Sequence, residues 1–397
     1  MLVVLPTQSY RATDFVEAAQ SLGVELTIAS ESELPLIAPD RQVLIDCADP
    51  AASAERVADL AAVTPIDAIV AADDSGVEIA ALASELIGLP SSPVAAVRAT
   101  LDKEMMRQLL ARAEVTQPAF QVVDRASVAE AAEQIGFPVV TKPRTRSASI
   151  GVMRADDFHD LIEAAALAAR HQHEDDGSER FLVERFVSGP EISVEGLIWD
   201  GVVEPLAIFD KPDQPDGPVF PETILVTPTS LPPATVAEVE RTVSAATHAL
   251  GLTQGPIHAE LRIENDVPTV LEIAGRTIGG LCGRSLSFGL MGDSLESLVL
   301  RQALGDRKRR SRFPGATGVL MIPVPRAGTL TSVDGIAEAE SVSGVTSIDI
   351  SIPVGANVKP TPDGDRYLGF VFARSQNPSE VVEALRAAHD RLDIVVS

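Results

Sequence analysis

Two glutamates on neighbouring runs of alternating apolar and polar residues have the spacing of a metal site in this 397-residue chain. Residues 257–280 contain both runs, separated by the turn sequence NDVP, and this pattern predicts a β-hairpin whose loop spans residues 264–268. Side chains alternate between the faces of a strand, so Glu260 lies directly opposite Glu272. Two carboxylates in that position repel each other, and a divalent cation relieves the repulsion. The hairpin therefore predicts a Mg²⁺ site.

The same register assigns the other side chains of the hairpin to its two faces. Leu261 lies opposite Leu271, and Leu271 and Ile273 point to the core. Val270 lies on the other face, with the glutamates. The alternative is a solvent-facing hairpin whose carboxylates are separately hydrated or paired with Arg262.

Two of the five lysines in the chain occupy positions suited to phosphate binding. Lys142 ends an apolar run and precedes residues 144–151, a hydroxyl-rich loop of the kind whose backbone N–H groups surround phosphate oxygens. Lys103 lies early in a predicted helix, where a solvated surface lysine is the alternative. Arg276 lies four residues after Glu272, and its planar guanidinium adds an anion-binding group beside the predicted metal.

The composition excludes several classes of protein. The two cysteines, Cys47 and Cys282, provide neither a disulfide framework nor a CxxC metal site, which is typical of a reducing cytoplasm. The N-terminus lacks a basic segment, and no run of about 18 apolar residues occurs, so we expect a cytoplasmic protein that does not span a membrane. The formal net charge of -25 disfavours binding to nucleic acid or to anionic membranes.

Three domains of α/β and α+β type are predicted from the order of the elements. Residues 1–92 alternate short β-branched runs with helical patterns, which indicates a parallel α/β domain that ends near the sequence LPSSP. No GxGxxG follows its first strand, so a dinucleotide site of the Rossmann type is not expected. Residues 93–312 form the second domain, with a lid subdomain at about residues 114–187. Residues 313–397 form a small α+β domain.

Four connecting segments complete the prediction. A strand–turn–strand at residues 181–198 indicates a hinge between the lid and the larger body. The proline-rich residues 210–221 indicate a long loop over the site. Residues 171–177 are expected to form a polar surface loop, and residues 306–312 a basic linker.

These features together resemble the ATP-grasp superfamily, and specifically its carboxylate–amine ligase branch, which includes the L-amino-acid ligases. Five pieces follow the family's order between about residues 95 and 290, and the flanking domains look like the family's arrangement. The pieces are Leu101-Asp102-Lys103, residues 138–143, residues 184–191, His258-Ala259-Glu260 and Glu272-Ile273-Ala274-Gly275-Arg276. The resemblance implies the ATP-grasp fold, with an N-terminal parallel α/β domain and a small C-terminal α+β domain.

The resemblance also implies the residues of a nucleotide site and its metal. The implied ATP-binding residues are Lys103, Lys142, Ser147, Ser149, Glu184, Arg185, Phe186, Val187 and Glu191. Glu260 and Glu272 are the implied ligands of Mg²⁺, or of Mn²⁺ in its place. The implied catalytic residues are Arg276, which stabilises the acyl phosphate, and Lys142. The implied substrate residues are Glu222, His258, Gly279, Gly280 and Arg284.

The implied reaction is ATP-dependent formation of an amide bond. A carboxylate attacks the γ-phosphate of ATP, and an amine then displaces phosphate from the acyl phosphate; one substrate is expected to be an amino acid. The alternatives are an ATP-grasp carboxylase or nucleotide-biosynthesis ligase, and a non-catalytic ATP-binding protein. Two departures bear on this choice: Ala274 stands where many members have Asn, and the segment after Glu222 lacks the family's Gly-His. Members are often dimers, so a homodimer is one expected state.

Overall fold

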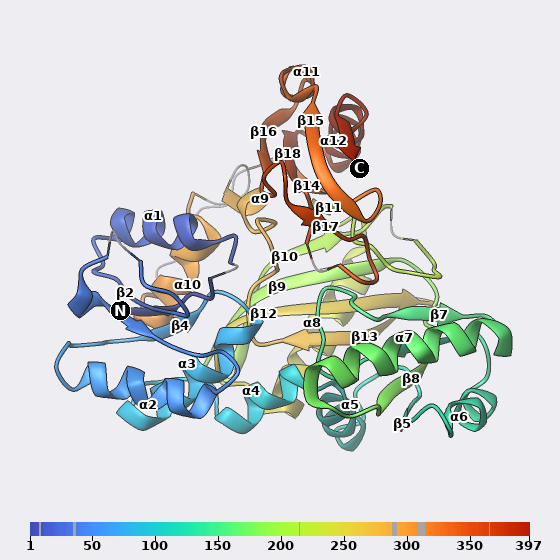
Figure 1. Cartoon of the computed structure of the whole chain (residues 1–397), viewed down its shortest axis with the longest axis horizontal. Coiled ribbons are helices and arrows are strands. Elements are labelled where there is room, and N and C mark those ends of the chain that lie inside the picture. The colour runs from blue at the N-terminus through green and yellow to red at the C-terminus, as the bar shows by residue number, and fades with distance from the viewer. Residues whose placement is uncertain (8, 35–36, 214, 288–291, 308–313, 365) are drawn as a thin grey trace.

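The chain folds around one eight-stranded antiparallel sheet, with three smaller sheets at its sides (Figure 1). This computed structural model describes residues 1–397 except residues 8, 35–36, 214, 288–291, 308–313 and 365. The central strands lie in the order β13 (Val267–Ala274), β12 (Gln254–Glu264), β9 (Glu191–Trp199), β10 (Val202–Asp210), β11 (Ile224–Thr227), β14 (Ala316–Ile322), β18 (Gly369–Ser375) and β16 (Val345–Ile350).

The N-terminal residues form the parallel sheet expected from their βαβ pattern. Its strands lie in the order β3 (Gln42–Leu44), β2 (Thr27–Ser30), β1 (Leu2–Val4) and β4 (Ile69–Ala71). The helices of this lobe are α1 (Ala12–Leu22), η1 (Pro39–Arg41), α2 (Pro50–Ala61) and α3 (Asp74–Ile87). Leu2 packs among residues of α2 and α3, whereas its neighbour Val3 packs with Phe15 of α1. Helices therefore cover both faces, as a parallel sheet requires.

The lid is an antiparallel sheet with two helices. The strands lie in the order β5 (Phe120–Val123), β8 (Phe181–Arg185), β6 (Val139–Lys142) and β7 (Met153–Ala155), and the helices are α6 (Val128–Ile135) and α7 (Phe158–Asp176). The expected surface loop at residues 171–177 is wrong, because α7 continues to Asp176 and ends at Gly177 with φ of 74°. His171 and Gln172 are buried, and the Gln172 side chain accepts a hydrogen bond from the Arg144 N–H at 2.6 Å.

The central sheet has one apolar and one polar face around β9 and β12. Ile192, Val194 and Ala259 pack against helices α4 (Val94–Leu101), α5 (Lys103–Arg112) and α8 (Pro233–Leu250). Strand periodicity turns the alternate residues, such as Glu191 and Glu195, to the opposite face. The charged groups of the middle of the chain therefore gather on that face.

The C-terminal residues extend the central sheet through β14, β18 and β16. Their other elements are α11 (Ile336–Glu340), α12 (Pro378–His389) and a three-stranded sheet of β17 (Asn357–Val358), β15 (Gly328–Asp334) and β19 (Asp393–Val396). Strand β15 was not predicted, because Leu330 is its one buried residue and no apolar alternation marks it. The short helices α9 (Arg284–Ser287) and α10 (Leu295–Ala303) precede this region. The expected basic linker, and the domain boundary within it, fall largely outside the described residues.

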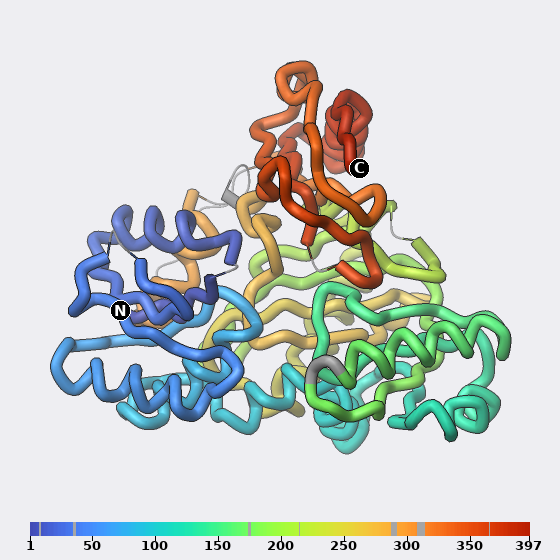
Figure 2. The backbone as a smooth tube through the Cα atoms, viewed as in Figure 1, coloured from blue at the N-terminus to red at the C-terminus, as the bar shows by residue number. Residues whose placement is uncertain are grey.

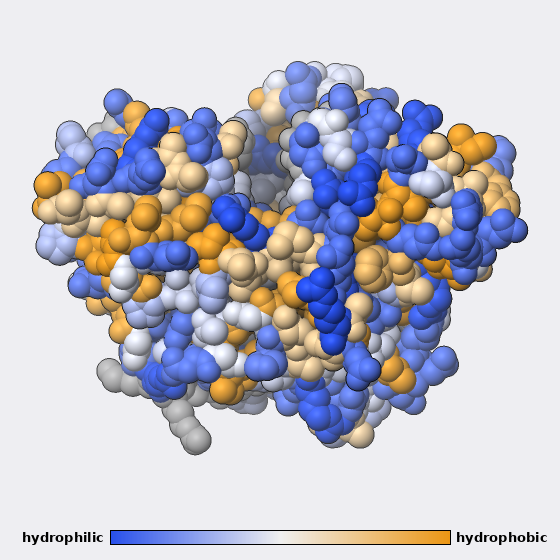
Figure 3. All heavy atoms as spheres, turned by 90° about the horizontal axis from the view of Figure 1, so that it is seen from below, coloured by the Kyte–Doolittle hydropathy of each residue, from blue (hydrophilic) through white to orange (hydrophobic). Residues whose placement is uncertain are grey.

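The molecule has three lobes around the sheet, and the tube in Figure 2 places the two termini on different lobes. On the face shown in Figure 3, hydrophilic residues interrupt the hydrophobic areas. Among the described residues, no helix combines the length and the apolar character needed to cross a membrane.

Candidate active site

A pocket lies between the lid and the polar face of the central sheet, and it encloses about 820 Å³ of space that includes some open solvent. The predicted site residues that line it are Lys103, Lys142, Ser149, Glu184, Arg185, Phe186, Val187, Glu191, Glu222, Glu260 and Glu272. They come from α5, the lid strands, the 144–151 loop, the hinge, the start of β9, the end of the proline-rich loop and the hairpin. The fold thus brings most of the predicted residues to one place.

The hairpin of β12 and β13 places Glu260 directly opposite Glu272, as predicted. Its turn is shorter than expected, because Asn265 and Asp266 form it with left-handed φ angles of 53° and 64°. Asn and Asp tolerate that conformation better than most residues. The two strands therefore remain paired out to Glu264, which extends the ladder that positions the two glutamates.

A β-bulge after Glu260 corrects the predicted core of the hairpin. Leu261 pairs with Val270, so Leu271 is the extra residue of β13. Val270 is buried in the core with Ile273, whereas Leu271 lines the pocket. The prediction that Leu271 faces the core and Val270 faces the glutamates is wrong, because the bulge reverses the alternation. The pocket gains an apolar wall beside its carboxylates.

Each of the opposed glutamates has a lysine partner. Lys103 Nζ lies 3.2 Å from Glu272 Oε2, and Lys211 Nζ lies 2.9 Å from Glu260 Oε1. Two ammonium groups thus also offset the repulsion between the glutamates, and the metal between them stays a prediction. The alternative partner, Arg262, instead donates to Glu191 Oε2 at 3.0 Å.

Lys211 is the central site residue that the sequence analysis missed. Its ammonium donates to Glu191 at 2.9 Å, to Glu222 at 2.6 Å and to Glu260 at 2.9 Å. Burial disfavours the charged form, but the three carboxylates outweigh it and raise the pKa of Lys211 well above its usual value. A signal was present: like Lys142, Lys211 is a rare lysine that immediately follows or ends an apolar strand.

Glu184 holds Lys142 in place. Its buried carboxylate accepts hydrogen bonds from Arg107 Nε at 2.6 Å and from Lys142 Nζ at 2.6 Å. Burial disfavours the carboxylate, but Arg107 and Lys142 outweigh it and lower the pKa of Glu184 to about 2. Arg107 was not selected from the sequence, because an arginine on an amphipathic helix has no distinguishing pattern. Both oxygens of the Glu184 carboxylate are thus bound by basic side chains of the protein.

The hinge between β8 and β9 is fixed by the hairpin and the proline-rich loop. Arg185 Nη2 lies 2.8 Å from Glu264 Oε2, and Glu264 also accepts the Ser188 N–H at 3.0 Å. Gly189 has φ of 90°, and a Cβ there would meet the Ile263 carbonyl oxygen at 2.1 Å, so only glycine permits this close approach. The Phe186 ring stacks on Phe220 with centroids 6.4 Å apart.

Arg276 lies outside the pocket lining, in a two-donor ion pair with Asp74 of α3. Its Nε and Nη2 donate to the two carboxylate oxygens at 2.8 and 2.9 Å. The Asp74 carboxylate also interacts with the Ser147 side chain, and although burial opposes its ionisation, Arg276 lowers its pKa. One carboxylate therefore joins the N-terminal lobe, the 144–151 loop and Arg276. Asp74 could have been noticed as the first residue of a helix that follows a parallel strand.

His258 is a buried cation beside Glu260. Its Nδ1 and the Glu195 Oε1 lie 2.5 Å apart, and its Nε2 lies 3.4 Å from Glu260 Oε1. Burial opposes the charge, but Glu195 and Glu260 outweigh it and raise the pKa of His258 to about 10. Lys211 and His258 likewise outweigh burial at Glu260 and hold its pKa well below the usual range. At neutral pH the imidazolium therefore helps to keep Glu260 ionised.

Like His258, the other three predicted substrate residues do not line the pocket. Gly280 has φ of 58°, and a Cβ there would meet the Phe370 ring at 2.7 Å, which explains the glycine by packing. A Cβ added at Gly279 would meet no heavy atom within 4 Å. Arg284 lies 2.7 Å from Asp14 and 3.1 Å from Asp349, so it links α1 to β16.

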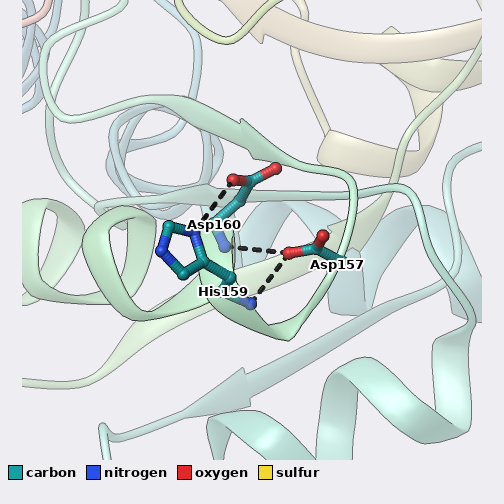
Figure 4. Close-up of side chains that lie close together, drawn as sticks. All are labelled: Asp157, His159 and Asp160. Atoms are coloured by element: carbon teal, nitrogen blue, oxygen red, sulfur yellow. Dashed lines mark hydrogen bonds and ion pairs between the residues drawn. The ribbon is translucent and has the colours of Figure 1, made fainter.

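A separate group of potential metal ligands lies on the surface at the start of α7 (Figure 4). Asp157 caps this helix by accepting the backbone N–H groups of His159 and Asp160 at 2.8 and 3.1 Å. The His159 side chain is 95% exposed. Helix capping accounts for this arrangement without a metal.

Comparison with known families agrees with this geometry. The ATP-grasp domain matches residues 135–285, the ATP-grasp N-terminal domain matches residues 16–91, and the L-amino acid ligase C-terminal domain 2 matches residues 320–397. This chain belongs to the ATP-grasp superfamily. The fold expected from the resemblance is confirmed.

Named ATP-grasp proteins show what the chain is similar to. Alanine–anticapsin ligase of Bacillus subtilis is 28% identical over 57% of this chain and 51% of its own length. D-alanine–D-alanine ligase of Bordetella petrii is 29% identical over 51% of this chain and 63% of its own length. The chain thus spans less than two thirds of the length of these curated relatives. The crystal structure of an L-amino acid ligase from Bacillus licheniformis is 25% identical, with a TM-score of 0.86 over 100% of this chain and 98% of that one.

The imidazolium of His258 predicts a pH dependence of stability in this ATP-grasp protein. The folded-state pKa of about 10 exceeds the ordinary value of 6.5, so the stabilisation is complete below about pH 6.5 and is lost as the pH rises towards 10. Within that window the free energy of unfolding should fall by about 1.4 kcal/mol per pH unit from this group. Urea denaturation at several pH values should show a shallower slope for His258→Gln. The exposed His159→Gln is the matched control, and equal slopes for wild type and His258→Gln would exclude the effect.

Proposed function

We propose that this protein is an ATP-dependent carboxylate–amine ligase that joins amino-acid substrates through an amide bond and releases ADP and phosphate. The observation that supports it most is a single pocket lined both by Lys103, Lys142 and Lys211 and by the opposed Glu260–Glu272 pair. Phosphoryl transfer depends on positioning and charge neutralisation more than on covalent participation of the protein, and these residue types supply both. The names of three similar proteins, alanine–anticapsin ligase, D-alanine–D-alanine ligase and L-amino acid ligase, each contain an amino acid and the word ligase. These names support the same reaction class.

The pocket suits a nucleoside triphosphate. Val140 and Leu271 provide apolar walls, and the hinge at residues 185–187 forms one edge. Lys103 and Lys142 are the proposed partners of the phosphates, beside the loop that contains Ser149. Glu191 is the proposed partner of the ribose hydroxyls, and Lys211 and Arg262 hold its carboxylate in position.

The hairpin carboxylates fit a hard divalent cation. Glu260 and Glu272 are paired in the ladder, and their side chains are 24% and 23% exposed towards the pocket. Mg²⁺, or Mn²⁺ in its place, supplies positive charge that neutralises phosphate oxygens. Ala274 has no side-chain oxygen, so it adds no metal ligand to these two carboxylates. Lys103 and Lys211 would then exchange part of their contact with the carboxylates for contact with phosphate.

The chain's own residues account for the two chemical steps. Attack by a substrate carboxylate on the γ-phosphorus forms an acyl phosphate as the bond from that phosphorus to the ADP oxygen breaks, and Lys211, which lines the pocket, is the proposed partner of the transferred group. The amine then attacks the acyl carbon and the C–O bond to phosphate breaks. Arg276 is the proposed stabiliser of the acyl phosphate. Closure of the lid excludes water, which would otherwise hydrolyse that intermediate.

Arg276→Lys should lower kcat by roughly 10²-fold, because an ammonium cannot reproduce the two-donor contact of a guanidinium. Steady-state kinetics with saturating ATP tests this, and the KM for ATP should change little because the proposed contact is with the acyl phosphate and not with ATP. Asp74→Asn, which keeps the shape of the partner, separates the role of the ion pair from that of the guanidinium. A rate within about twofold of wild type for Arg276→Lys would make Arg276 a structural residue.

The carboxylase, nucleotide-biosynthesis and non-catalytic alternatives have less support, because the C-terminal domain match and the named relatives are those of amino-acid ligases. The domain division at residues 92/93 and 312/313 remains part of the proposal. A cytoplasmic location is proposed because Cys47 and Cys282 are both free thiols. A homodimer is the proposed assembly, and light scattering of the purified chain tests it.

A screen for phosphate release tests the proposed function. The purified chain is incubated with Mg-ATP and pairs of amino acids, and both free phosphate and the mass of any amide are measured. We expect one or a few pairs to stimulate release, with one amide formed per phosphate. ATP binding without release for every pair would favour the non-catalytic alternative, and bicarbonate-dependent release would favour the carboxylase.

A further inference from the structure

A second cleft lies on the other side of the 144–151 loop from the nucleotide pocket. It encloses about 1870 Å³ of space that includes open solvent, and it is bounded by this loop, by α7 of the lid and by the C-terminal segment around β17. The loop contributes Ser149 to the pocket but Arg146 and Ile150 to the cleft. The two spaces therefore share one wall.

The cleft has the opposite charge to the protein as a whole. Its ionisable lining residues are Arg146, Arg170, His171, Lys359, Arg366 and Asp363. The chain has 57 acidic residues against 32 lysines and arginines, so a chance sample of its surface would contain more carboxylates than cations. Four permanent cations against one carboxylate indicate a place where negative charge is bound. Apolar residues such as Ile150 and Ile352 form other parts of the wall.

The cations are held by contacts that orient them. Arg366 Nε donates to the Tyr10 hydroxyl at 2.9 Å, and its guanidinium carbon lies 4.7 Å from the centroid of the Tyr10 ring. Arg170 forms an ion pair with Asp363, and His171 Nε2 lies 3.0 Å from the same carboxylate oxygen. These contacts come from three different lobes of the molecule, so the cleft is assembled only in the complete fold.

Asp363 is a carboxylate of the protein itself that contacts two of the basic side chains of the cleft, Arg170 and His171. Its side chain is 46% exposed, so an incoming anion can replace it at Arg170 and His171 at small cost. The neighbouring Pro362 carbonyl accepts the Gly151 N–H at 3.0 Å. That hydrogen bond joins the Asp363 segment to the end of the loop that covers the nucleotide pocket. The cleft and the loop are therefore in direct contact.

We propose that this cleft binds an oxyanion group, a carboxylate or a phosphate ester, on the side chain of an amino acid that serves as the amine substrate. The inference rests on the proposed function for the identity of the ligand. The reacting carboxylate becomes part of the acyl phosphate in the nucleotide pocket, whereas the amine substrate reacts through nitrogen and keeps any anionic group it has. That group requires cations beside the phosphate loop and away from Lys103, Lys142 and Lys211, which the nucleotide occupies. The cleft supplies them.

Direct binding tests the cleft without catalysis. Titration calorimetry measures the affinity for inorganic phosphate of the full chain saturated with Mg²⁺ and a non-hydrolysable ATP analogue. The double variant Lys359→Gln/Arg366→Gln should bind phosphate roughly 10- to 100-fold more weakly, because two charged hydrogen-bond donors are lost. Asp363→Asn should bind it more tightly, because the competing carboxylate is removed. Unchanged affinity in the double variant, or weaker binding by Asp363→Asn, would overturn the proposal.

A matched control separates the cleft from overall charge and folding. Arg391→Gln removes one cation from the same C-terminal region, where the Arg391 side chain lies at 3.5 Å from the Ala387 carbonyl oxygen and outside the cleft lining. It should bind phosphate like wild type, and all variants should keep the wild-type melting temperature within a few degrees. Loss of affinity in Arg391→Gln equal to that of the double variant would show a general charge effect and would overturn the proposal.

Turnover identifies the source of the oxyanion. Phosphate release is compared for the amine substrates L-glutamate and L-glutamine, and for O-phosphoserine and serine. The acidic member of at least one pair should have a kcat/KM about tenfold or more above its neutral partner, and the double variant should lose this preference while the KM for ATP stays the same. A higher kcat/KM for glutamate than for glutamine identifies the bound group as a side-chain carboxylate. A higher kcat/KM for O-phosphoserine than for serine identifies it as a phosphate ester. Equal kcat/KM within both pairs, or a preference for glutamine and serine, would overturn the proposal. Absence of ligation with every pair would contradict the proposed function, and calorimetry would still decide whether the cleft binds the anion.

Discussion

Glu272→Gln is expected to lower the ligation rate by roughly 10³-fold or more, because the substitution removes one of two carboxylates proposed to hold the metal. The amide keeps the shape of the side chain and can still accept a hydrogen bond from Lys103. The side chain is partly exposed, so we expect little change in the melting temperature of the protein alone. The stabilisation by Mg-nucleotide should shrink, since binding to the folded state is what raises the melting temperature.

The control for this substitution is Glu204→Gln on the same central sheet. Glu204 lies outside the pocket and accepts the Trp199 Nε1–H at 3.0 Å, a hydrogen bond that glutamine preserves. Both variants lose one negative charge, but only Glu272→Gln should lose ligation and its response to Mg²⁺ concentration. Retained ligation in Glu272→Gln would contradict the metal site, and with it the proposed roles of the hairpin.

Lys211→Met should abolish ligation and also destabilise the protein by about 3–5 kcal/mol, because it leaves a buried group of carboxylates without its cation. Glu191, Glu222 and Glu260 all accept hydrogen bonds from this one ammonium. Urea denaturation measures the loss of stability, and phosphate release measures the loss of activity.

A second substitution distinguishes the electrostatic cause from a packing defect. Burial and the nearby Glu260 charge raise the pKa of Glu222 even with Lys211 present, so Glu222 is the carboxylate most easily replaced by a neutral group. Lys211→Met/Glu222→Gln should recover part of the stability lost in Lys211→Met, but none of the ligation. If the double variant is no more stable than Lys211→Met, the carboxylate cluster is not the cause of the loss.

The opposed glutamates could be predicted from the sequence because their geometry depends on local alternation and one turn. The bulge at Leu271 could not, since it changes the side-chain alternation without any glycine or proline to mark it. The same limit applies to the C-terminal strand β15, whose residues are mostly polar and half-exposed. Local patterns thus determine which residues face the pocket only where each strand is regular.

The missed site residues are those defined by partners far away in the chain. Lys211 contacts Glu260 across 49 residues, Arg107 contacts Glu184 across 77, and Asp74 contacts Arg276 across 202. Each is an ordinary charged residue in its own segment. Their significance arises from burial together with opposite charges, which only the assembled lobes create. Charged residues at the ends of apolar strands and at helix starts are the positions where such partners could have been sought.

The most direct test of the proposed chemistry follows oxygen from the carboxylate substrate to phosphate. The carboxylate substrate, found by the amino-acid screen, is labelled with ¹⁸O in both carboxylate oxygens, and the released phosphate and the amide are analysed by mass spectrometry. Attack of the carboxylate on the γ-phosphorus predicts one ¹⁸O in each phosphate and one in the amide carbonyl, with ADP as the nucleotide product. Unlabelled phosphate formed together with amide, or AMP and pyrophosphate as products, would contradict ligation through an acyl phosphate.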